Sequence, residues 1–186
     1  MVRILFLAGL SIILLVMEGL AQTPALWIRV SNEKKSASHV MYFGNDNRAT
    51  YGIDKELGEL EGPPLSPSLD VRWMSRRKEI SFGFGLLNHD FIPCPTDAGR
   101  KDTFVLMISQ RDRLPAAWIL EWKKDELREF ADSIFLVVPG ETTRKVNMLE
   151  SDSTKVLNEE GVQRINIYKH GRRSTWRSLK PPTKPR

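Results

Sequence analysis

Short apolar stretches of strand length recur along the chain. Alternation is clearest in residues 69–73, where Leu69, Val71 and Trp73 share one face and the two charged residues between them share the other. Runs that alternate or stay apolar occupy residues 26–30, 40–43, 69–73, 80–85, 103–109, 117–122, 134–138, 144–148, 154–157 and 163–168. Turn residues separate these runs, so the pattern predicts nine or ten short strands.

Only one segment has the spacing of a helix. Residues 123–131 are rich in helix formers and place Leu127, Phe130 and Ala131 on one side. Many strands with one short helix predict an all-β sandwich or barrel. Four tryptophans, at positions 27, 73, 118 and 122, lie within the apolar runs. We expect them to pack in the core rather than to form an exposed carbohydrate-binding platform.

Two connections are unusually long. Connections of this length without their own secondary structure are uncommon and are usually functional or disordered. Residues 42–69 are dense in Gly, Pro, Asn and acidic residues, and residues 88–102 contain two prolines between charged flanks. The first is expected to be fastened to the core by apolar side chains, namely Phe43, Tyr51, Ile53, Leu57 and Leu60. The second is predicted to be a loop throughout.

The first long connection carries a resemblance to a known family. Its motifs are Phe43-Gly44, Ala49-Thr50, Gly52-Ile53-Asp54, Leu57-Gly58-Glu59 and Pro63-Pro64, followed by Asp70 and Arg72. This string resembles a largely uncharacterised module of exported proteins from Bacteroidetes, Ignavibacteria and Chlorobi-type bacteria, often found in substrates of type IX secretion. The resemblance covers about residues 25–170. It implies an immunoglobulin-like or fibronectin-like β-sandwich.

The N-terminus has the pattern of a secretory signal peptide. Arg3 precedes an apolar run at residues 4–16, and Gly19-Leu20-Ala21 supplies the small residues of a cleavage site before Gln22. The run is shorter than the roughly 20 residues that a transmembrane helix needs. We therefore expect a signal helix over residues 1–21, a domain over 22–169 and an extracytoplasmic address. The alternative is a retained helix that anchors the domain at the inner membrane, facing the periplasm.

Positive charge is concentrated at the C-terminus. The chain carries a net charge of +5, and residues 164–186 contribute +8 with no acidic residue, which leaves −3 for residues 22–163 because Arg3 and Glu18 cancel. The Pro-rich tail from residue 170 is predicted to bind another envelope protein or an anionic envelope surface rather than nucleic acid. Its candidate contacts are Arg172, Arg173, Trp176, Arg177, Lys180, Lys184 and Arg186. A solvated terminus without a dedicated ligand is the alternative.

The acidic residues of the first long connection are weak candidates for calcium ligands. Asp46, Asp54, Glu56 and Glu59 supply the oxygen atoms that Ca²⁺ prefers, but their spacing is not that of an EF-hand. Hydrogen bonds from these acids to nearby backbone amides are the favoured interpretation. Glu59 is expected to cap the backbone or to pair with Arg72. No resident metal or cofactor is predicted.

Catalytic chemistry has little support in the sequence. The three histidines, at positions 39, 89 and 170, accompany no G-x-S-x-G elbow or zinc motif. Cys94 is expected to be a half-buried loop residue, since a nucleophilic cysteine needs a base and only His89 is near in sequence. The sequence therefore favours a non-enzymatic exported envelope protein that acts as a binding or structural module. The alternative is a membrane-anchored accessory subunit of a larger complex.

Overall fold

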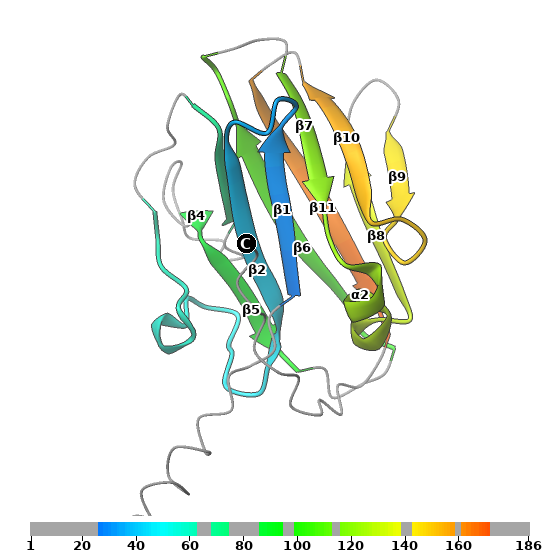
Figure 1. Ribbon diagram of the computed structural model, residues 1–186. Helices are drawn as coiled ribbons and strands as arrows, with labels where there is room; N and C mark the ends of the chain where they lie inside the picture. The colour runs from blue at the N-terminus through cyan, green and yellow to red at the C-terminus, as the bar shows by residue number, and fades with distance from the viewer. Residues whose placement is uncertain are drawn as a thin grey trace, which may run out of the picture. The chain divides into compact units, whose positions relative to one another are not determined.

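The fold is a sandwich of two β-sheets (Figure 1). The structure is a computed structural model and describes residues 26–62, 68–74, 86–94, 99–112, 116–138, 143–158 and 161–171. The strands are β1 (Leu26–Asn32), β2 (Ser38–Asp46), β3 (Asp70–Met74), β4 (Leu86–Leu87), β5 (His89–Pro93), β6 (Lys101–Ser109), β7 (Ala116–Glu121), β8 (Ser133–Val138), β9 (Arg144–Asn147), β10 (Ser153–Asn158) and β11 (Val162–His170). A 3-10 helix, η1 (Lys55–Leu57), and an α-helix, α2 (Lys124–Phe130), complete the described elements.

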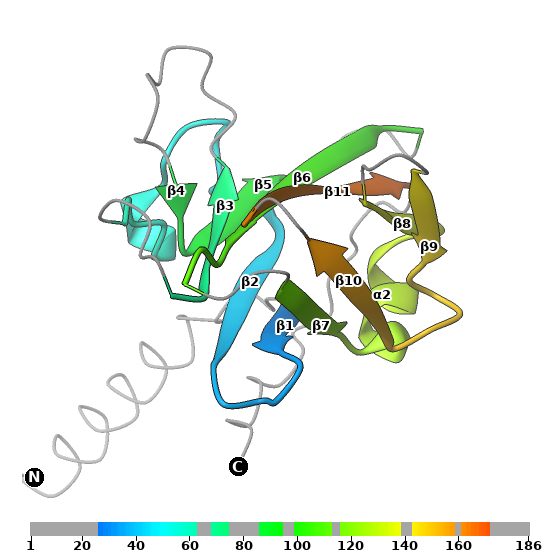
Figure 2. The same ribbon diagram turned by 90° about the horizontal axis from the view of Figure 1, so that it is seen from above.

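The strands divide into a five-stranded and a six-stranded layer. The first sheet has the order β10-β7-β1-β2-β5, and the second has the order β4-β3-β6-β11-β8-β9. Figure 2 shows the two layers facing each other. All the strand pairs are antiparallel except β2 and β5, which run parallel.

These observations confirm the predicted all-β sandwich with one short α-helix in the described part of the chain. The immunoglobulin-like topology stays an implication of the resemblance. The predicted signal segment (residues 1–21), the expected strand at residues 80–85 and the tail contacts from Arg172 onward lie outside the described residues. The last strand extends to His170, two residues beyond its predicted end.

The prediction for the second long connection is wrong. Residues 88–102 were expected to form a loop, yet His89–Pro93 form strand β5, which pairs in parallel with residues 42–46 of β2. The segment lacks a clean alternation, because Asp90, Phe91 and Ile92 are all buried. Its partner strand is more than 40 residues away in the sequence. Such non-local pairing leaves no signal in the local pattern.

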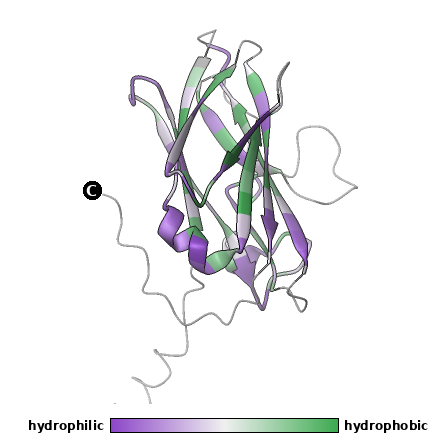
Figure 3. Ribbon diagram, turned by 90° about the vertical axis from the view of Figure 1, so that its right-hand side faces the viewer, coloured by the Kyte–Doolittle hydropathy of each residue, from purple (hydrophilic) through white to green (hydrophobic). Residues whose placement is uncertain are grey.

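The core lies between the facing sides of the two sheets. Strand alternation directs one face of each strand inward, and Ile28 and Val30 of β1 and Phe104, Leu106 and Ile108 of β6 are all fully buried. Apolar residues therefore run along the strands, whereas α2 is mostly hydrophilic (Figure 3). The predicted core positions of three tryptophans are confirmed, since Trp73, Trp118 and Trp122 are at most 3% exposed.

Trp27 is the exception among the strand tryptophans. It is half-buried and lies between two cations, with the Arg29 guanidinium 5.6 Å and the Lys123 ammonium 5.8 Å from its ring centroid. Buried Trp118 and Trp122 instead donate their indole N–H groups to oxygen atoms, which include Gln110 Oε1 at 3.1 Å for Trp118. These bonds satisfy the polar end of each ring inside the core.

A buried carboxylate fastens the first long connection to the edge of the first sheet. Glu59 has no exposed surface, and its Oε1 accepts a hydrogen bond from the Phe91 backbone N–H at 2.6 Å. Its Oε2 accepts from the Asp54 N–H at 2.7 Å. Leu60 N–H donates to Asn88 Oδ1 at 2.9 Å, beside an isolated bridge between Glu61 and Leu87. Residues 59–61 thus lie alongside residues 87–91 and cover the outer edge of β5.

The expectation that apolar side chains hold this connection is largely wrong. Phe43 is buried, but it belongs to β2, which continues to Asp46. Tyr51 and Leu60 are 51% and 53% exposed, and Ile53 and Leu57 are half-buried. Hydrogen bonds to buried carboxylates replace the expected apolar contacts. Of the two roles expected for Glu59, the structure shows the hydrogen bonds to backbone amides.

Replacement of Glu59 tests this fastening. In Glu59→Gln the amide retains one acceptor oxygen and turns an N–H donor toward a second backbone N–H. We expect the free energy of unfolding to fall by about 1–3 kcal/mol, measured by denaturant titration. The exposed neighbour Glu61 provides the control, since Glu61→Gln should change it by less than about 0.5 kcal/mol. Equal effects of the two changes would contradict the assignment.

Candidate binding pocket

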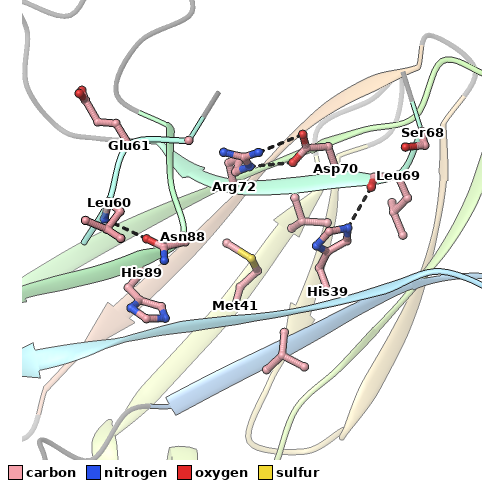
Figure 4. A pocket seen from close by; sticks show the side chains of 13 residues that line it. His39, Met41, Leu60, Glu61, Ser68, Leu69, Asp70, Arg72, Asn88 and His89 are labelled. Atoms are coloured by element: carbon pink, nitrogen blue, oxygen red, sulfur yellow. Dashed lines mark hydrogen bonds and ion pairs between the residues drawn. The ribbon is translucent and has the colours of Figure 1, made fainter. Parts of the chain in front are cut away.

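A pocket of about 650 Å³ opens between β2 and β3. Residues 39–41 of β2 form one wall, and residues 68–72 form the opposite wall. Residues 60–62 and the pair Asn88–His89 complete the lining. Figure 4 shows His39 and Met41 between the two strands, whereas Asp70 and Arg72 lie on the side of β3 away from β2. The fastened connection therefore supplies one rim of the pocket, and its volume lies in the range of ligand-binding clefts.

An ion pair dominates the electrostatics of the pocket. Arg72 Nε donates to Asp70 Oδ1 at 2.7 Å, and Nη2 donates to Oδ2 at 3.2 Å, the two-pronged geometry of a strong guanidinium–carboxylate contact (Figure 4). The two side chains are only 16% and 6% exposed. A Cβ atom at Gly62 would lie 1.1 Å from Arg72 Nη1. Glycine at position 62 therefore makes room for the guanidinium.

The pocket brings together residue types that could suggest hydrolysis, but not the geometry. Ser68, His39 and Asp70 all line it. His39 Nε2 lies 2.9 Å from the Leu69 carbonyl oxygen, and both Asp70 oxygen atoms accept bonds from Arg72. A triad requires the carboxylate to orient the imidazole. Here each group is oriented by a different partner.

His89 forms the inner end of the pocket. Its ring packs edge-on against Tyr42, with centroids 5.3 Å apart, and its buried Nδ1 has no hydrogen-bond partner among the described residues. Burial lowers the pKa of His89 below its ordinary value of 6.5, against an opposing contribution from the Gly58 backbone. The neutral imidazole is therefore the form that the folded chain favours.

The acidic residues serve separate turns rather than one cation site. Asp46 Oδ1 accepts the Arg48 backbone N–H at 2.8 Å, and Asp54 accepts the Thr50 N–H at 2.6 Å. Glu56 is exposed. Across the described part of the chain, no group of three or more acidic, His or Cys residues could hold a metal ion. The predicted turn-type hydrogen bonds of Asp46 and Asp54 are confirmed.

The cysteine and its candidate base are far apart. Cys94 is half-buried, as predicted, and follows the last residue of β5. His89 begins the same extended strand, so at about 3.3 Å per residue the two Cα atoms are separated by roughly 16 Å. Nearness in the sequence therefore does not make them a nucleophile and base.

Sequence reasoning missed a buried lysine. Lys169 is 1% exposed, its Nζ lies 3.7 Å from Asp102 Oδ2, and it sits 4.6 Å from the Phe130 ring centroid. Burial lowers the pKa of Lys169, and the nearby Asp102 carboxylate opposes that shift. The sequence contains a signal for this burial, because Lys169 continues the alternation in which Ile165 and Ile167 occupy inward positions. Its burial makes it a structural ion pair rather than a ligand contact.

The chain was compared with models of protein families, with curated proteins and with solved structures. None of them matches. Within the ranges that the structure describes, no helix is long and apolar enough to cross a membrane. The pocket is therefore interpreted from its own residues.

Gly62→Ala tests how the pocket accommodates Arg72. The added methyl group must displace the guanidinium, so we expect a loss of about 1–2 kcal/mol in the free energy of unfolding, measured by denaturant titration. The same change in an Arg72→Ala background should cost clearly less, because the clashing group is absent. An undiminished cost in that background would show that another contact is responsible.

Acidification tests the environment of His89. A pKa lowered in the folded state means that protonation favours the unfolded chain. The stabilisation is complete above the ordinary value of 6.5 and is lost as the pH falls through the folded-state pKa. Between about pH 7.5 and about pH 5, stability should therefore fall more steeply for the wild type than for His89→Phe. Parallel pH profiles from denaturant titrations would contradict this.

Proposed function

We propose that the chain is a non-enzymatic binding module of the bacterial cell envelope. The observation that carries the proposal is the state of the polar groups in the β2–β3 pocket. Asp70 is held by Arg72, and His39 contacts the Leu69 carbonyl, so these groups are arranged for recognition rather than for proton transfer. The pocket also sits beside sheet strands, where a rigid scaffold can hold a binding site in place.

The signal-peptide pattern of residues 1–21 supports an extracytoplasmic address, in the periplasm, on the outer surface or outside the cell. The resemblance to exported sandwich modules supports the same address. Another envelope protein or an anionic envelope surface fits the basic tail as a partner. The second candidate function is an accessory subunit anchored by an uncleaved N-terminal helix, which would require the apolar run at residues 4–16 to stay attached to the domain.

Mass determination of the protein from its native cells separates the two functions. We expect a mature N-terminus at Gln22 and recovery without detergent, because the apolar run is too short to span a membrane. A membrane-bound protein that retains residues 1–21 would instead establish the anchored subunit.

Ligand retention tests the pocket. A component that co-purifies with the wild type should be recovered less with Arg72→Ala, because that change removes the pocket's ion pair. Arg29→Ala is the matched control, since Arg29 pairs with Glu121 of β7 and is not among the described residues that line the pocket. Recovery that is equal for all three proteins would place binding elsewhere. Chemical conversion of the component by the wild type, abolished in His39→Ala, would overturn the non-enzymatic assignment.

A further inference from the structure

The outward side of the six-stranded sheet presents ordered rows of side chains. Because Phe104, Leu106, Ile165 and Ile167 point into the core, the residues that alternate with them point outward. Cross-strand pairing sets Thr103, Tyr168, Phe135 and Asn147 in one row over β6, β11, β8 and β9. The next row consists of Val105, Asn166, Val137 and Lys145. Figure 2 shows these four strands side by side in one layer.

Two aromatic rings stand at the centre of this face. Tyr168 is 44% exposed, and the half-buried Phe135 is its direct cross-strand neighbour. The Lys145 ammonium lies 3.7 Å from the Phe135 ring centroid. At about 4.8 Å between strands, the row from β6 to β9 spans roughly 14 Å. The face therefore offers two neighbouring aromatic rings, with polar Thr103 and Asn147 at the ends of the row.

Cations flank the aromatic row on both sides. Lys101 lies in the row before it, and Lys145 and Arg164 lie in the rows after it. The outward positions of β6, β8, β9 and β11 include no Asp or Glu within the described residues. We call this surface the basic face. A ligand that covered it would meet positive charge at both margins and no acidic side chain of these strands.

A hollow continues the basic face beyond β6. It has a volume of about 320 Å³ and lies over Thr103 and Val105. Tyr51, 51% exposed, forms a wall of it, and the Arg100 guanidinium lies 5.1 Å from that ring's centroid. The hollow therefore adds a third aromatic ring with its own cation. Asp102 also lines it, but this carboxylate bonds Arg100 Nε at 3.0 Å and faces Lys169.

From these features we infer that the basic face binds an anionic polysaccharide. A sugar ring would stack on Tyr168, and the carboxylate groups of the polymer would pair with the cations, including those that lie over the Phe135 and Tyr51 rings. Charge complementarity and the aromatic rings among the cations both favour a polymer of charged rings. A lipid surface fits less well, because the apolar side chains Val105, Phe135 and Val137 are half-buried. The inference rests on the proposal that the chain is a binding module, and it concerns strands that do not line the β2–β3 pocket.

Titration of the full chain with polygalacturonate, a polymer of carboxylated sugar rings, tests the inference. We expect measurable binding that Tyr168→Ala weakens about five- to tenfold through loss of a ring contact. Tyr168→Phe retains the ring and should bind nearly as well as the wild type. Lys145→Gln and Arg164→Gln should each weaken binding about two- to fivefold. Lys155→Gln, on the opposite sheet, is the matched charge control and should have no effect.

Further probes separate the basic face from non-specific attraction. Dextran, which has sugar rings without charge, should bind more weakly than polygalacturonate, and so should polyphosphate, which has charge without rings. Two results would assign the interaction to the tail and overturn the inference. One is equal binding of polyphosphate and polygalacturonate, and the other is binding that is lost only in Arg172→Gln/Arg173→Gln. The chain could instead bind phosphatidylglycerol vesicles more tightly than polygalacturonate, in a way that depends on Tyr168. That result would overturn the inference in favour of a membrane surface.

Failure here is distinguishable from failure of the proposed function. If polygalacturonate does not bind while the unfolding midpoints of all variants match the wild type, the polysaccharide inference is wrong. Cleavage before Gln22 and Arg72-dependent retention of a ligand would still support an exported binding module. If a chain that retains residues 1–21 binds polygalacturonate as expected, the polysaccharide inference holds and the protein is an anchored subunit.

Discussion

Burial of the Glu59 carboxylate is the constraint on which one side of the sandwich depends. A carboxylate without exposed surface is stable only if hydrogen bonds replace its lost hydration, and the Asp54 and Phe91 amides supply them. The Phe91 amide belongs to β5, the edge strand of the first sheet. An edge strand with unsatisfied amides is a template for unwanted pairing. The same bond therefore satisfies the acid, covers the edge and holds the rim of the β2–β3 pocket.

The sandwich itself was predictable because, in most strands, apolar residues alternate with polar ones and so identify the inward face. Val71 and Trp73, or Ile165 and Ile167, alternate with polar residues and are all buried. Strand β5 was not predictable for the opposite reason: its consecutive residues Asp90–Ile92 are buried, and its pairing with β2 is set by the tertiary structure. The loop was misjudged for a related reason. Apolar residues suggested its anchors, but neither exposed Tyr51 nor exposed Leu60 performs that role.

The residues that carry the sequence resemblance have identifiable structural tasks. Thr50 donates both its backbone N–H and its hydroxyl group to Asp54, at 2.6 and 2.9 Å. Gly58 adopts a positive φ of 83°, where glycine is the favoured residue, and Glu59 follows it. Asp70 and Arg72 form the buried ion pair. A motif built from such contacts specifies how a loop closes one edge of a sandwich. It carries no information about the ligand, which explains why sequence reasoning could anticipate the fold more fully than the binding sites.

The two candidate binding surfaces differ in what the sequence must preserve. The β2–β3 pocket needs the covering residues 59–62, because Gly62 lies against Arg72 and Leu60 is tied to Asn88. The basic face depends mainly on the register of β6, β11, β8 and β9. A slip of one residue would exchange the inward and outward positions and turn Tyr168 inward. Buried Lys169 adds a polar contact to that register, since it pairs directly with Asp102 across the strands. The same slip would turn Lys169 outward and break its ion pair with Asp102. The ion pair inside the core thus helps to specify which side chains form the outer face.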